Sequence, residues 1–465
     1  MKKNFIFFSL WLLMGFIPKT AAQIPENKLT PEEKVAGLSA LWAEAKYNEA
    51  FFENIGAEKW DSAYQTFIRP VMDTPNDYLY YRQLQRFCAL LRDGHSRVYY
   101  RKAPVTTTLF DQLQWYLSSI EGKAIVSSIN QRIKEEIPIG SEIVEVNGMP
   151  TAEYLEKEVI PYISSSTDYV RRDMAVQTMF TSLKGDSYQV KIKTPAGKQI
   201  EKKITYEILP EIKNDPMYPA PPARHLMEIK WYPGQIAYVA LNSFKQRELI
   251  DSFAVCLPEL QKAKKLIIDL RQNSGGKSDV SEEIMSHLTP DKALTPPIWC
   301  TRVHSPAYMS WGRRATAADT VDNPFMKKVY EVSHRIYYEY GEPHQIDIPA
   351  ATERIVVPTV FLTSHGTASA AEDFLILADK QPHITKIGQP SNGSTGNPIL
   401  FSITEDLGFQ ICSKKDLYPD GRPFVGCGVQ PDIEVTPTVQ DLIDGYDRTL
   451  QTALDYLAKT DMPRP

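Results

Sequence analysis

The sequence lacks the charge imbalance and the repetition that mark several specialised classes of protein. Its 465 residues carry a formal net charge of only −5, with no basic stripe and no acidic tail, so overall charge gives no reason to expect binding to nucleic acid or to an anionic membrane surface. No repeat of about 20 to 50 residues is visible, which argues against a repeat architecture. What is present, 43% hydrophobic and 23% charged residues, is typical of a globular chain long enough for two or three domains.

Cysteine is scarce, and its spacing excludes the usual uses of clustered thiols. The five cysteines are an odd number at scattered positions with no CxxC pair, so the sequence indicates neither a metal cage nor a disulfide framework. We expect most of them to be buried thiols packed as small hydrophobic side chains, with pairing of Cys412 and Cys427 across a hairpin as the alternative for those two. No HExxH motif, Walker loop or clustered ligand spacing occurs either. We therefore expect no metal and no organic cofactor.

Long apolar runs are absent except at the N-terminus. Two lysines, an apolar stretch over residues 5–17 and a small-residue exit together predict a cleavable secretory signal, residues 1–22, cut after Ala22. An uncleaved anchor helix is the alternative, but Pro18 ends the apolar run short of the roughly 20 residues that span a bilayer. No cysteine follows the cleavage site, so we expect no lipid anchor there. The mature protein is predicted to be exported, periplasmic or extracellular, with no stable membrane insertion.

Two segments of different pattern follow the signal. Residues 26–101 are predicted to be helical, because TPEE at residues 30–33 is typical of a helix start and apolar residues then recur at helical spacing. Residues 106–210 instead contain short strand-like runs around one helix near 152–163, and the NG pair at 147–148 is typical of a tight hairpin turn. We expect a helical region followed by a small module rich in β-strands.

The rest of the chain has an alternating pattern. A proline-rich stretch at residues 211–226 is predicted to be a linker, and over residues 227–440 strand-like and helix-like patterns alternate. Strands are predicted at 236–241, 265–270 and 355–362, and helices at 246–262, 278–288 and 368–379. Such alternation favours βα units on a largely parallel sheet, followed by a C-terminal helix and tail at 441–465. The predicted fold class is α/β, in an α+β multidomain chain.

Two breaks in pattern fall where strands of the predicted sheet end. The first, DLRQNSGG at residues 269–276, runs from a buried strand into paired glycines and then a helix. Paired glycines allow a sharp turn and present backbone N–H groups, which bind an oxyanion or a phosphate, although a simple tight turn has the same pattern. Because ligands bind at the carboxyl ends of parallel strands, this break is a candidate site.

The second break is FLTSHGTASAAEDF, residues 361–374, where an apolar strand ends in small polar residues and a helix follows. Ser369 is predicted to lie in the first turn of that helix, where aligned N–H dipoles favour developing negative charge. A serine there is also a common N-cap, which needs no chemistry. Both explanations stay open from this stretch alone.

Three stretches in this order resemble one protease family. DLRQNSGG, TASAAE and GCGVQPDIEV, with the β-rich module ahead of them, resemble the C-terminal processing, or tail-specific, serine peptidases and the related tricorn core protease. The resemblance implies that Ser369 is the nucleophile and that the N–H groups of Gly275 and Ala370 form the oxyanion hole. It also implies a PDZ-like domain at residues 106–210, which captures peptide ends by strand addition.

This sequence lacks the lysine that is the general base in the serine-lysine dyad members of that family. The resemblance places this lysine in a loop after the serine, but Ser394 occupies the matching position and no lysine lies between Lys386 and Lys414. The tricorn-like branch uses a histidine ahead of the PDZ-like domain, which makes His95, in the sequence DGHS, the candidate base. A turn histidine at the end of the helical region is the alternative. His365, just before the candidate nucleophile, is a second candidate base.

The carboxylate that would orient this histidine is open. The tricorn-like branch has a glutamate shortly before its GVxPD run, but Val425 is at the comparable position. Asp93, Glu372 and Asp420 are the candidate substitutes. For each of them the alternative is a surface carboxylate with an ordinary polar partner.

The favoured hypothesis is an exported serine endopeptidase that acts on a peptide or protein substrate, without a cofactor and without nucleic acid. The alternative is a peptide-binding protein that keeps the fold and has lost catalysis, because the expected lysine and glutamate are missing. A carbohydrate-active enzyme has no convincing carboxylate pair behind it. The segment 290–349, with Trp311, Arg313 and Arg314, is predicted either to cover the cleft or to be an ordinary helical insertion. The sequence predicts no oligomeric state.

Overall fold

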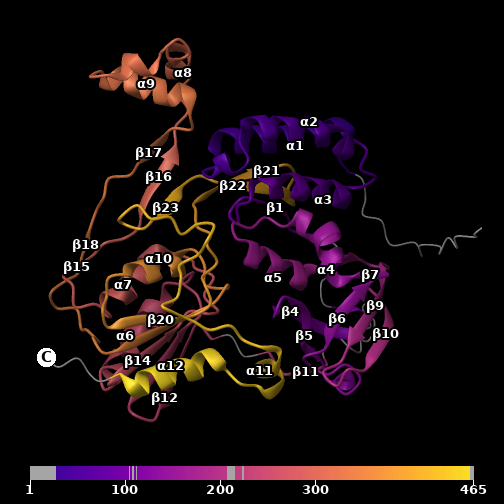
Figure 1. Cartoon of the computed structure of the whole chain (residues 1–465), viewed down its shortest axis with the longest axis vertical. Helices are drawn as coiled ribbons and strands as arrows, with labels where there is room; N and C mark the ends of the chain where they lie inside the picture. The colour runs from indigo at the N-terminus through magenta and orange to yellow at the C-terminus, as the bar shows by residue number, and fades with distance from the viewer. Residues whose placement is uncertain are drawn as a thin grey trace, which may run out of the picture.

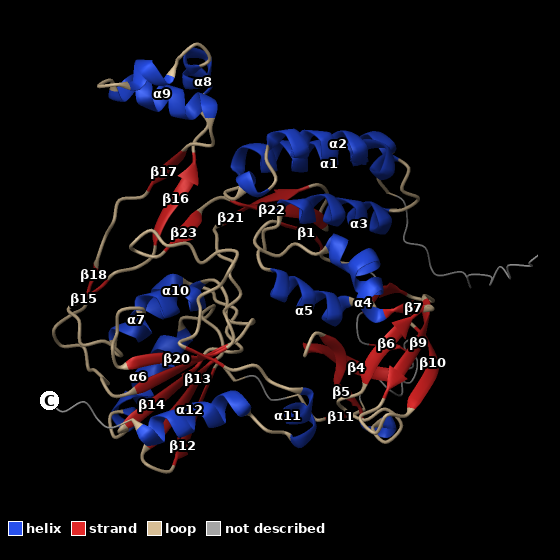
Figure 2. Ribbon diagram, in the orientation of Figure 1, coloured by secondary structure: helices blue, strands red, loops and turns tan. Residues whose placement is uncertain are grey.

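The computed structural model describes residues 28–103, 105–106, 109–110, 113–206, 215–221 and 225–460. The predicted signal sequence, residues 1–22, and its cleavage site lie outside these ranges. Figure 1 shows a helical N-terminal region, a strand-rich module and an α/β core, and Figure 2 separates their helices from their strands. None of the helices in the described ranges combines the length and the apolar character that a membrane crossing requires.

The N-terminal region is helical, as the sequence predicts, and contains three α-helices. They are α1 (Pro31–Asn48), α2 (Ala57–Met72) and α3 (Asp77–Cys88). The predicted start is confirmed, because the N–H of Thr30 donates to Glu33 Oε2 at 2.8 Å and the N–H of Glu33 donates back to Thr30 Oγ1 at 3.2 Å. The three helices bury Trp60 against Phe87, whose rings stack with centroids 4.1 Å apart.

Strands from the far end of the chain complete this region. After the short helix η2 (Ala89–Leu91), β1 (Arg97–Tyr100) pairs antiparallel with β22 (Leu407–Cys412), and β22 pairs with β21 (Pro398–Ser402). Phe409 and Ile411 of β22 are buried in the same hydrophobic cluster as Trp60. Residues 26–101 therefore do not enclose a core by themselves.

The strand-rich module contains one antiparallel sheet in the order β10-β9-β6-β5-β4-β3. Its strands are β3 (Leu109–Phe110), β4 (Leu113–Ile120), β5 (Lys123–Asn130), β6 (Glu142–Val146), β9 (Ser187–Lys193) and β10 (Gln199–Thr205), with β7 (Met149–Pro150) on β6 and β11 (Met217–Tyr218) on β5. A separate pair joins β2 (Val105–Thr106) to β8 (Ser182–Leu183). The predicted hairpin turn is confirmed, with φ of 50° at Asn147 and 79° at Gly148. Part of the predicted linker adds β11 to this sheet.

The module has one more helix than the sequence analysis predicts. The predicted helix near 152–163 is a run of helical turns, α4 (Thr151–Tyr154), η4 (Leu155–Val159) and η5 (Ile160–Tyr162). The additional helix is α5 (Asp168–Thr178), which buries Val170, Ala175 and Val176. Figure 1 shows α5 on the side of the module that faces the rest of the chain.

The α/β core confirms the predicted parallel sheet. Its strand order is β12-β13-β14-β19-β20-β24, and every pair is parallel except β12 with β13. The strands are β12 (Met227–Tyr232), β13 (Ile236–Leu241), β14 (Lys265–Asp269), β19 (Thr359–Thr363), β20 (Ile384–Gly388) and β24 (Ile433–Glu434). The helices are α6 (Glu248–Leu260), α7 (Ser278–Ser286), α10 (Ala370–Leu377), α11 (Val439–Asp444) and α12 (Arg448–Lys459).

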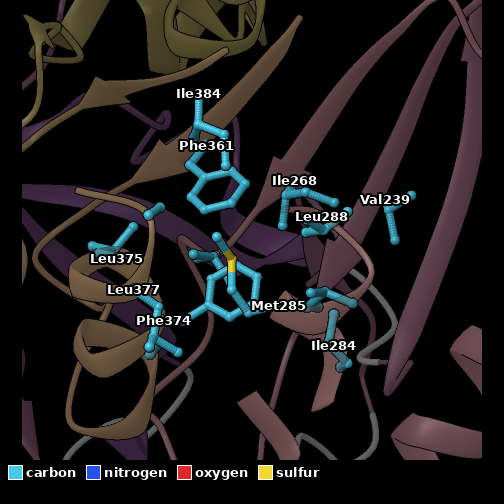
Figure 3. Packing of buried hydrophobic residues seen from close by; sticks show 14 of the residues in the cluster. Val239, Ile268, Ile284, Met285, Leu288, Phe361, Phe374, Leu375, Leu377 and Ile384 are labelled. Atoms are coloured by element: carbon cyan, nitrogen blue, oxygen red, sulfur yellow. The ribbon is translucent and has the colours of Figure 1, made fainter. Parts of the chain in front are cut away.

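Alternating side chains of this sheet pack into two hydrophobic layers. On one face Phe361 of β19 stacks on Phe374 of α10, with ring centroids 5.1 Å apart, and Figure 3 shows the surrounding aliphatic side chains. On the other face Leu362 lies in one cluster with Ala453 and Leu457 of α12. Because β14 and β19 are neighbouring parallel strands held between these layers, the loops that follow them begin at the same edge of the sheet.

The segment 290–349 is an insertion that extends away from α10 rather than a cover over the core. It contains β15 (Ala293–Leu294), β16 (Ile298–Arg302), α8 (Pro306–Gly312), η6 (Ala317–Thr320), α9 (Pro324–His334), β17 (Tyr338–Tyr340) and β18 (Ile346–Asp347). β16 pairs with β17 and with β23 (Lys415–Leu417), and β15 pairs with β18. Figure 1 shows α8 and α9 beyond the rest of the chain and well apart from α10.

Candidate functional site

Ser369 lies between the end of β19 and the start of α10, in an unusual backbone conformation. Its φ is 56° and its ψ is −126°, whereas an N-cap serine ordinarily has extended backbone angles. A positive φ is costly for a residue with a side chain and persists only where the surroundings enforce it. The Ser369 N–H donates to Glu372 Oε2 at 2.9 Å, which helps to hold this turn. Ser369 is therefore the N-cap of α10, with a capping box to Glu372, but in a backbone conformation that an ordinary N-cap does not have.

The glycine pair after β14 touches the Ser369 turn. A Cβ atom on Gly275 would lie 2.5 Å from the Ala368 carbonyl oxygen, 2.7 Å from Ser369 Cβ and 2.9 Å from the Ala370 nitrogen. Gly275 also has a φ of +88°, so both its conformation and its close contacts require glycine. The two breaks that the sequence analysis singles out are thus adjacent in space.

Asn273 holds this glycine loop in place, a role that the sequence analysis missed. Its buried side chain donates from Nδ2 to the Leu241 carbonyl oxygen at 2.9 Å and accepts the Gly275 N–H at Oδ1, also at 2.9 Å. The Ala368 N–H donates to the Asn273 carbonyl oxygen at 3.1 Å. In this structure the Gly275 N–H therefore bonds within its own loop.

The charged residues of the same stretch anchor the C-terminal helix. Arg271 pairs with Asp269 at 2.6 Å and with Asp447, next to α12, at 2.7 Å. Asp269 also accepts a hydrogen bond from the Tyr238 hydroxyl at 2.8 Å. These contacts account for the Asp and the Arg of DLRQNSGG as structural residues that fix the end of β14.

His95 lies beside the loop that follows β20, and its ring contacts a serine other than Ser369. His95 Nδ1 is 2.7 Å from Ser394 Oγ. Burial is the main cause that lowers the pKa of His95 below its ordinary value, although Asp93 acts in the opposite direction. The imidazole is therefore mainly neutral near pH 7, which is the state that a general base needs. Ser394 is the position at which the family resemblance expects a lysine.

Glu372 connects the Ser369 turn to the Ser394 loop. Its buried carboxylate accepts the N–H of Ser369 at 2.9 Å, the hydroxyl of Ser391 at 2.5 Å, the N–H of Gly393 at 2.6 Å and the N–H of Ser394 at 3.3 Å. Burial raises the pKa of Glu372 to about 8, and the four hydrogen bonds act in the opposite direction. These hydrogen bonds join the turn of Ser369 to the loop that contacts His95, and none of them goes to the imidazole.

Replacing Glu372 with glutamine is expected to change how stability depends on pH. The folded chain holds this proton up to a pKa of about 8, above the ordinary value of 4.5, so the free energy of unfolding falls as the pH rises between these values. Glutamine does not titrate, so the variant should lack this slope of up to about 1.4 kcal/mol per pH unit. Urea unfolding of both proteins across this pH range measures the difference.

The neighbouring buried carboxyl provides the matched control. Burial is the largest cause that raises the pKa of Asp373 to about 7. Asp373→Asn should therefore lose its share of the slope below about pH 7 and keep the part between pH 7 and 8 that Glu372 contributes. Identical slopes in the wild type and in Glu372→Gln would contradict the role given to Glu372.

The other two candidate carboxylates do not reach the imidazole ring. Asp93 is buried, accepts the backbone N–H of His95 at 3.2 Å and accepts the Ser166 hydroxyl at 3.0 Å. Asp420 pairs with Arg422 at 2.8 Å, and both line a small cavity with residues from the C-terminal end of α10. Asp93 thus contacts the backbone of His95 and not its ring. Asp420 lies near the C-terminal end of α10, whereas Ser369 lies at the N-terminal end.

His365, the second candidate base, is engaged by the strand-rich module. Its Nδ1 is 2.6 Å from Asp173 Oδ2 of α5, and its ring stacks on Tyr169 with centroids 4.4 Å apart. The Tyr169 hydroxyl donates to the Ser391 carbonyl oxygen at 2.6 Å. The first turn of α5 therefore contacts both the turn before Ser369 and the loop before Ser394. No sequence signal indicated this contact, because α5 itself was not predicted.

One buried group of potential metal ligands includes Asp93, which accepts the backbone N–H of His95. Among the described residues, Glu49, Asp93 and Cys412 offer ligand atoms within 4.8 Å of one another. Glu49 accepts a hydrogen bond from Ser96, and Cys412 Sγ donates to the carbonyl oxygens of Lys414 at 3.3 Å and Thr395 at 3.5 Å. Burial, followed by the charge of Asp93, raises the pKa of Glu49 well above its ordinary value.

All five cysteines are free thiols in the structure. Cys88, Cys300 and Cys412 are buried, as expected for most of the set, whereas Cys256 is partly exposed and Cys427 is exposed. Cys412 and Cys427 do not form the disulfide that the sequence analysis left open.

Comparison with known proteins agrees with this geometry. Residues 235–435, which span the sheet from β13 to β24, match the model of peptidase family S41. The crystal structure of mature CPAF is 16% identical, and the match covers 92% of this chain and 97% of that chain with a TM-score of 0.67. Mature CPAF complexed with lactacystin is also 16% identical, and the match covers 92% and 98% of the two chains with a TM-score of 0.65. At this identity the two structures show a shared fold. Through residues 235–435 of its α/β core, the chain is thus similar to peptidase family S41, and this match supports a relation to the tail-specific proteases.

Proposed function

We propose that this protein is an exported serine endopeptidase of the S41 type that cleaves peptide or protein substrates with Ser369 as the nucleophile. The observation that carries the proposal is the backbone of Ser369, whose φ of 56° places a serine in strained geometry between a buried strand and a helix. A sharp strand-to-helix turn of this kind exposes a nucleophilic hydroxyl in other α/β hydrolases. Strain at one residue of a well-packed core is typical of functional sites.

His95 is proposed to be the general base. It would take the proton of the Ser369 hydroxyl at Nε2 and return it to the leaving amine. This role requires a proton on Nδ1, and Ser394 Oγ, 2.7 Å away, can accept a hydrogen bond from that proton. Ser394 would then fix the tautomer, the part that a carboxylate plays in a Ser-His-Asp triad. A neutral hydroxyl stabilises the imidazolium less than a carboxylate does, so we expect modest turnover.

The oxyanion of the tetrahedral intermediate is proposed to bind at the start of α10. The N–H of Ala370 lies at the positive end of that helix, beside Gly275. The second donor, the Gly275 N–H, bonds to Asn273 in this structure, so binding of the substrate has to exchange that bond for one to the oxyanion. The acyl group is then released by water.

The strand-rich module is proposed to bind the substrate peptide. It is the region in which the sequence analysis expects a PDZ-like domain, and it contains a cavity of about 390 Å³. Arg82, Asn147 and Glu158 are among the polar residues that line the cavity. Val146, Met149 and Val159 also line it, so the cavity offers both polar and apolar side chains to a peptide.

A specific observation also favours the alternative, a peptide-binding protein without catalysis. The ring of His95 bonds to Ser394, the Gly275 N–H bonds to Asn273, and neither Asp93, Glu372 nor Asp420 bonds to the imidazole. A chain that had lost catalysis could keep these contacts permanently. The two proposals differ in whether the Ser369 hydroxyl is reactive.

Labelling with a fluorophosphonate tests that reactivity. We expect the folded protein to take up one label, located by mass spectrometry in the tryptic peptide 355–380, which contains Ser369. Heat-denatured protein should not react, because the activation depends on the fold. A label in peptide 387–414 would assign the nucleophile to Ser394, and the absence of any label together with retained peptide binding would favour the alternative.

A further inference from the structure

The helical arm, residues 303–337, has almost no hydrophobic core of its own. Its helices α8 and α9 pack closely where Gly312 meets Ser333, but Gly312, Val329 and Val332 are its only buried residues. Neither valine belongs to the four hydrophobic clusters of the described chain. Most apolar side chains of the arm are therefore available at its surface.

Three aromatic rings gather on the surface of the arm. Tyr308, Trp311 and Phe325 form an aromatic cluster in which each pair of ring centroids is 5.8 to 6.0 Å apart. Trp311 is 56% exposed and Phe325 is 53% exposed, and Val321 in the loop between the helices is 69% exposed. Contiguous apolar surface of this kind, on an element far from the hydrophobic cores, marks an interaction site.

The arm also has an excess of basic side chains. The arm contains five lysines and arginines against three acidic residues, in a chain whose net charge is −5. Arg313, Arg314 and Lys327 are exposed, and no ion pair within the described part of the chain involves any of them. Lys328 Nζ lies 5.9 Å from the ring centroid of Tyr308. The arm is thus a local positive and aromatic surface on a negatively charged protein.

We infer that the aromatic cluster and the basic residues of the arm bind the surface of a membrane that contains anionic lipid. Tryptophan and tyrosine favour the boundary between head groups and acyl chains, and unpaired arginines and lysines are attracted by anionic head groups. Because the arm projects beyond the rest of the chain, a flat surface reaches it without touching the core (Figure 1). This contact is peripheral, so it needs no helix that crosses the bilayer. The inference does not depend on the proposed function.

Sedimentation with lipid vesicles tests the inference. The chain that begins at Gln23, the expected product of signal cleavage, is mixed with vesicles of phosphatidylcholine that contain phosphatidylglycerol or lack it. We expect binding to the anionic vesicles alone, weakening as salt is added. Arg313→Glu with Arg314→Glu, and separately Trp311→Ser with Phe325→Ser, should each lower the partition coefficient by about tenfold or more.

A charge-matched variant controls for net charge. Lys59 and Lys459 are exposed lysines on helices away from the arm, and Lys59→Glu with Lys459→Glu changes the net charge as much as the double arginine variant. The control should bind as the wild type does, and thermal unfolding should show that all variants are folded.

Four results would overturn the inference. The first is no binding of the wild type to anionic vesicles at low salt, and the second is an equal loss of binding in the Lys59 and Lys459 control. The third is self-association without lipid that Trp311→Ser with Phe325→Ser abolishes, which would assign the surface to a second copy of the chain. Binding of the arm to polyglutamate but not to vesicles would likewise assign it to an acidic protein partner.

Discussion

Replacing Ser369 with alanine is expected to lower kcat/KM by at least about 10,000-fold, to leave the fold intact and to abolish fluorophosphonate labelling. The nucleophile is the one group that the reaction cannot replace, whereas the loss of one hydroxyl removes little packing. The turn itself should persist, because the Ser369 N–H bond to Glu372 and the contact with Gly275 involve atoms that alanine also has. Hydrolysis of fluorescently labelled casein measures turnover, and thermal unfolding checks the fold.

Ser394→Ala is the matched control for this prediction. Ser394 also carries a hydroxyl near His95, but it is buried and its proposed role is to fix the tautomer of the imidazole. The variant should lose about 10- to 100-fold in kcat and keep its labelling at Ser369. The opposite pattern, with turnover lost in Ser394→Ala and kept in Ser369→Ala, would show that the chain uses a different serine.

The sequence predicted those parts of the fold that have a local signal. The strand at 236–241 is confirmed, and its signal is a continuous apolar run. The helix start at Thr30 is confirmed as well, and its signal is a capping box within four residues. The pairing of β1 with β22 was not predicted, because no property of residues 97–100 indicates a partner that far along the chain. The helix α5 was missed as well, and with it the contact of Asp173 to His365.

Some contacts of the candidate site also follow from the sequence, whereas others depend on tertiary packing. The approach of Gly275 to Ser369 follows from the sequence, since both residues come after neighbouring parallel strands, and such strands end at one edge of the sheet. The contact between His95 and Ser394 joins positions 299 residues apart and depends on the pairing of β1 with β22. The buried position of Glu372, with four donors around it, is equally a product of tertiary packing. A pattern in sequence could suggest these residues as candidates but not their partners.

Replacing His95 with alanine is expected to lower kcat by about 1,000-fold or more, with labelling of Ser369 strongly slowed. Without the imidazole, the Ser369 hydroxyl keeps its ordinary high pKa and attacks slowly. In the wild type, kcat/KM should rise with pH as His95 loses its proton, and because burial lowers its pKa, this rise should be centred below the ordinary value of 6.5. The residual activity of His95→Ala should lack this step.

His365→Ala separates the two histidines, because both are candidate bases for the same serine. The His365 ring bonds to Asp173 and stacks on Tyr169, so its loss should loosen the contact with α5 and change KM more than kcat. The pH step below 6.5 should remain in this variant, since His95 is still present. Full turnover in His95→Ala, combined with loss of both turnover and the pH step in His365→Ala, would transfer the role of general base to His365. In that case the contact of His365 with Asp173 of α5 would position the general base itself, rather than the turn before Ser369.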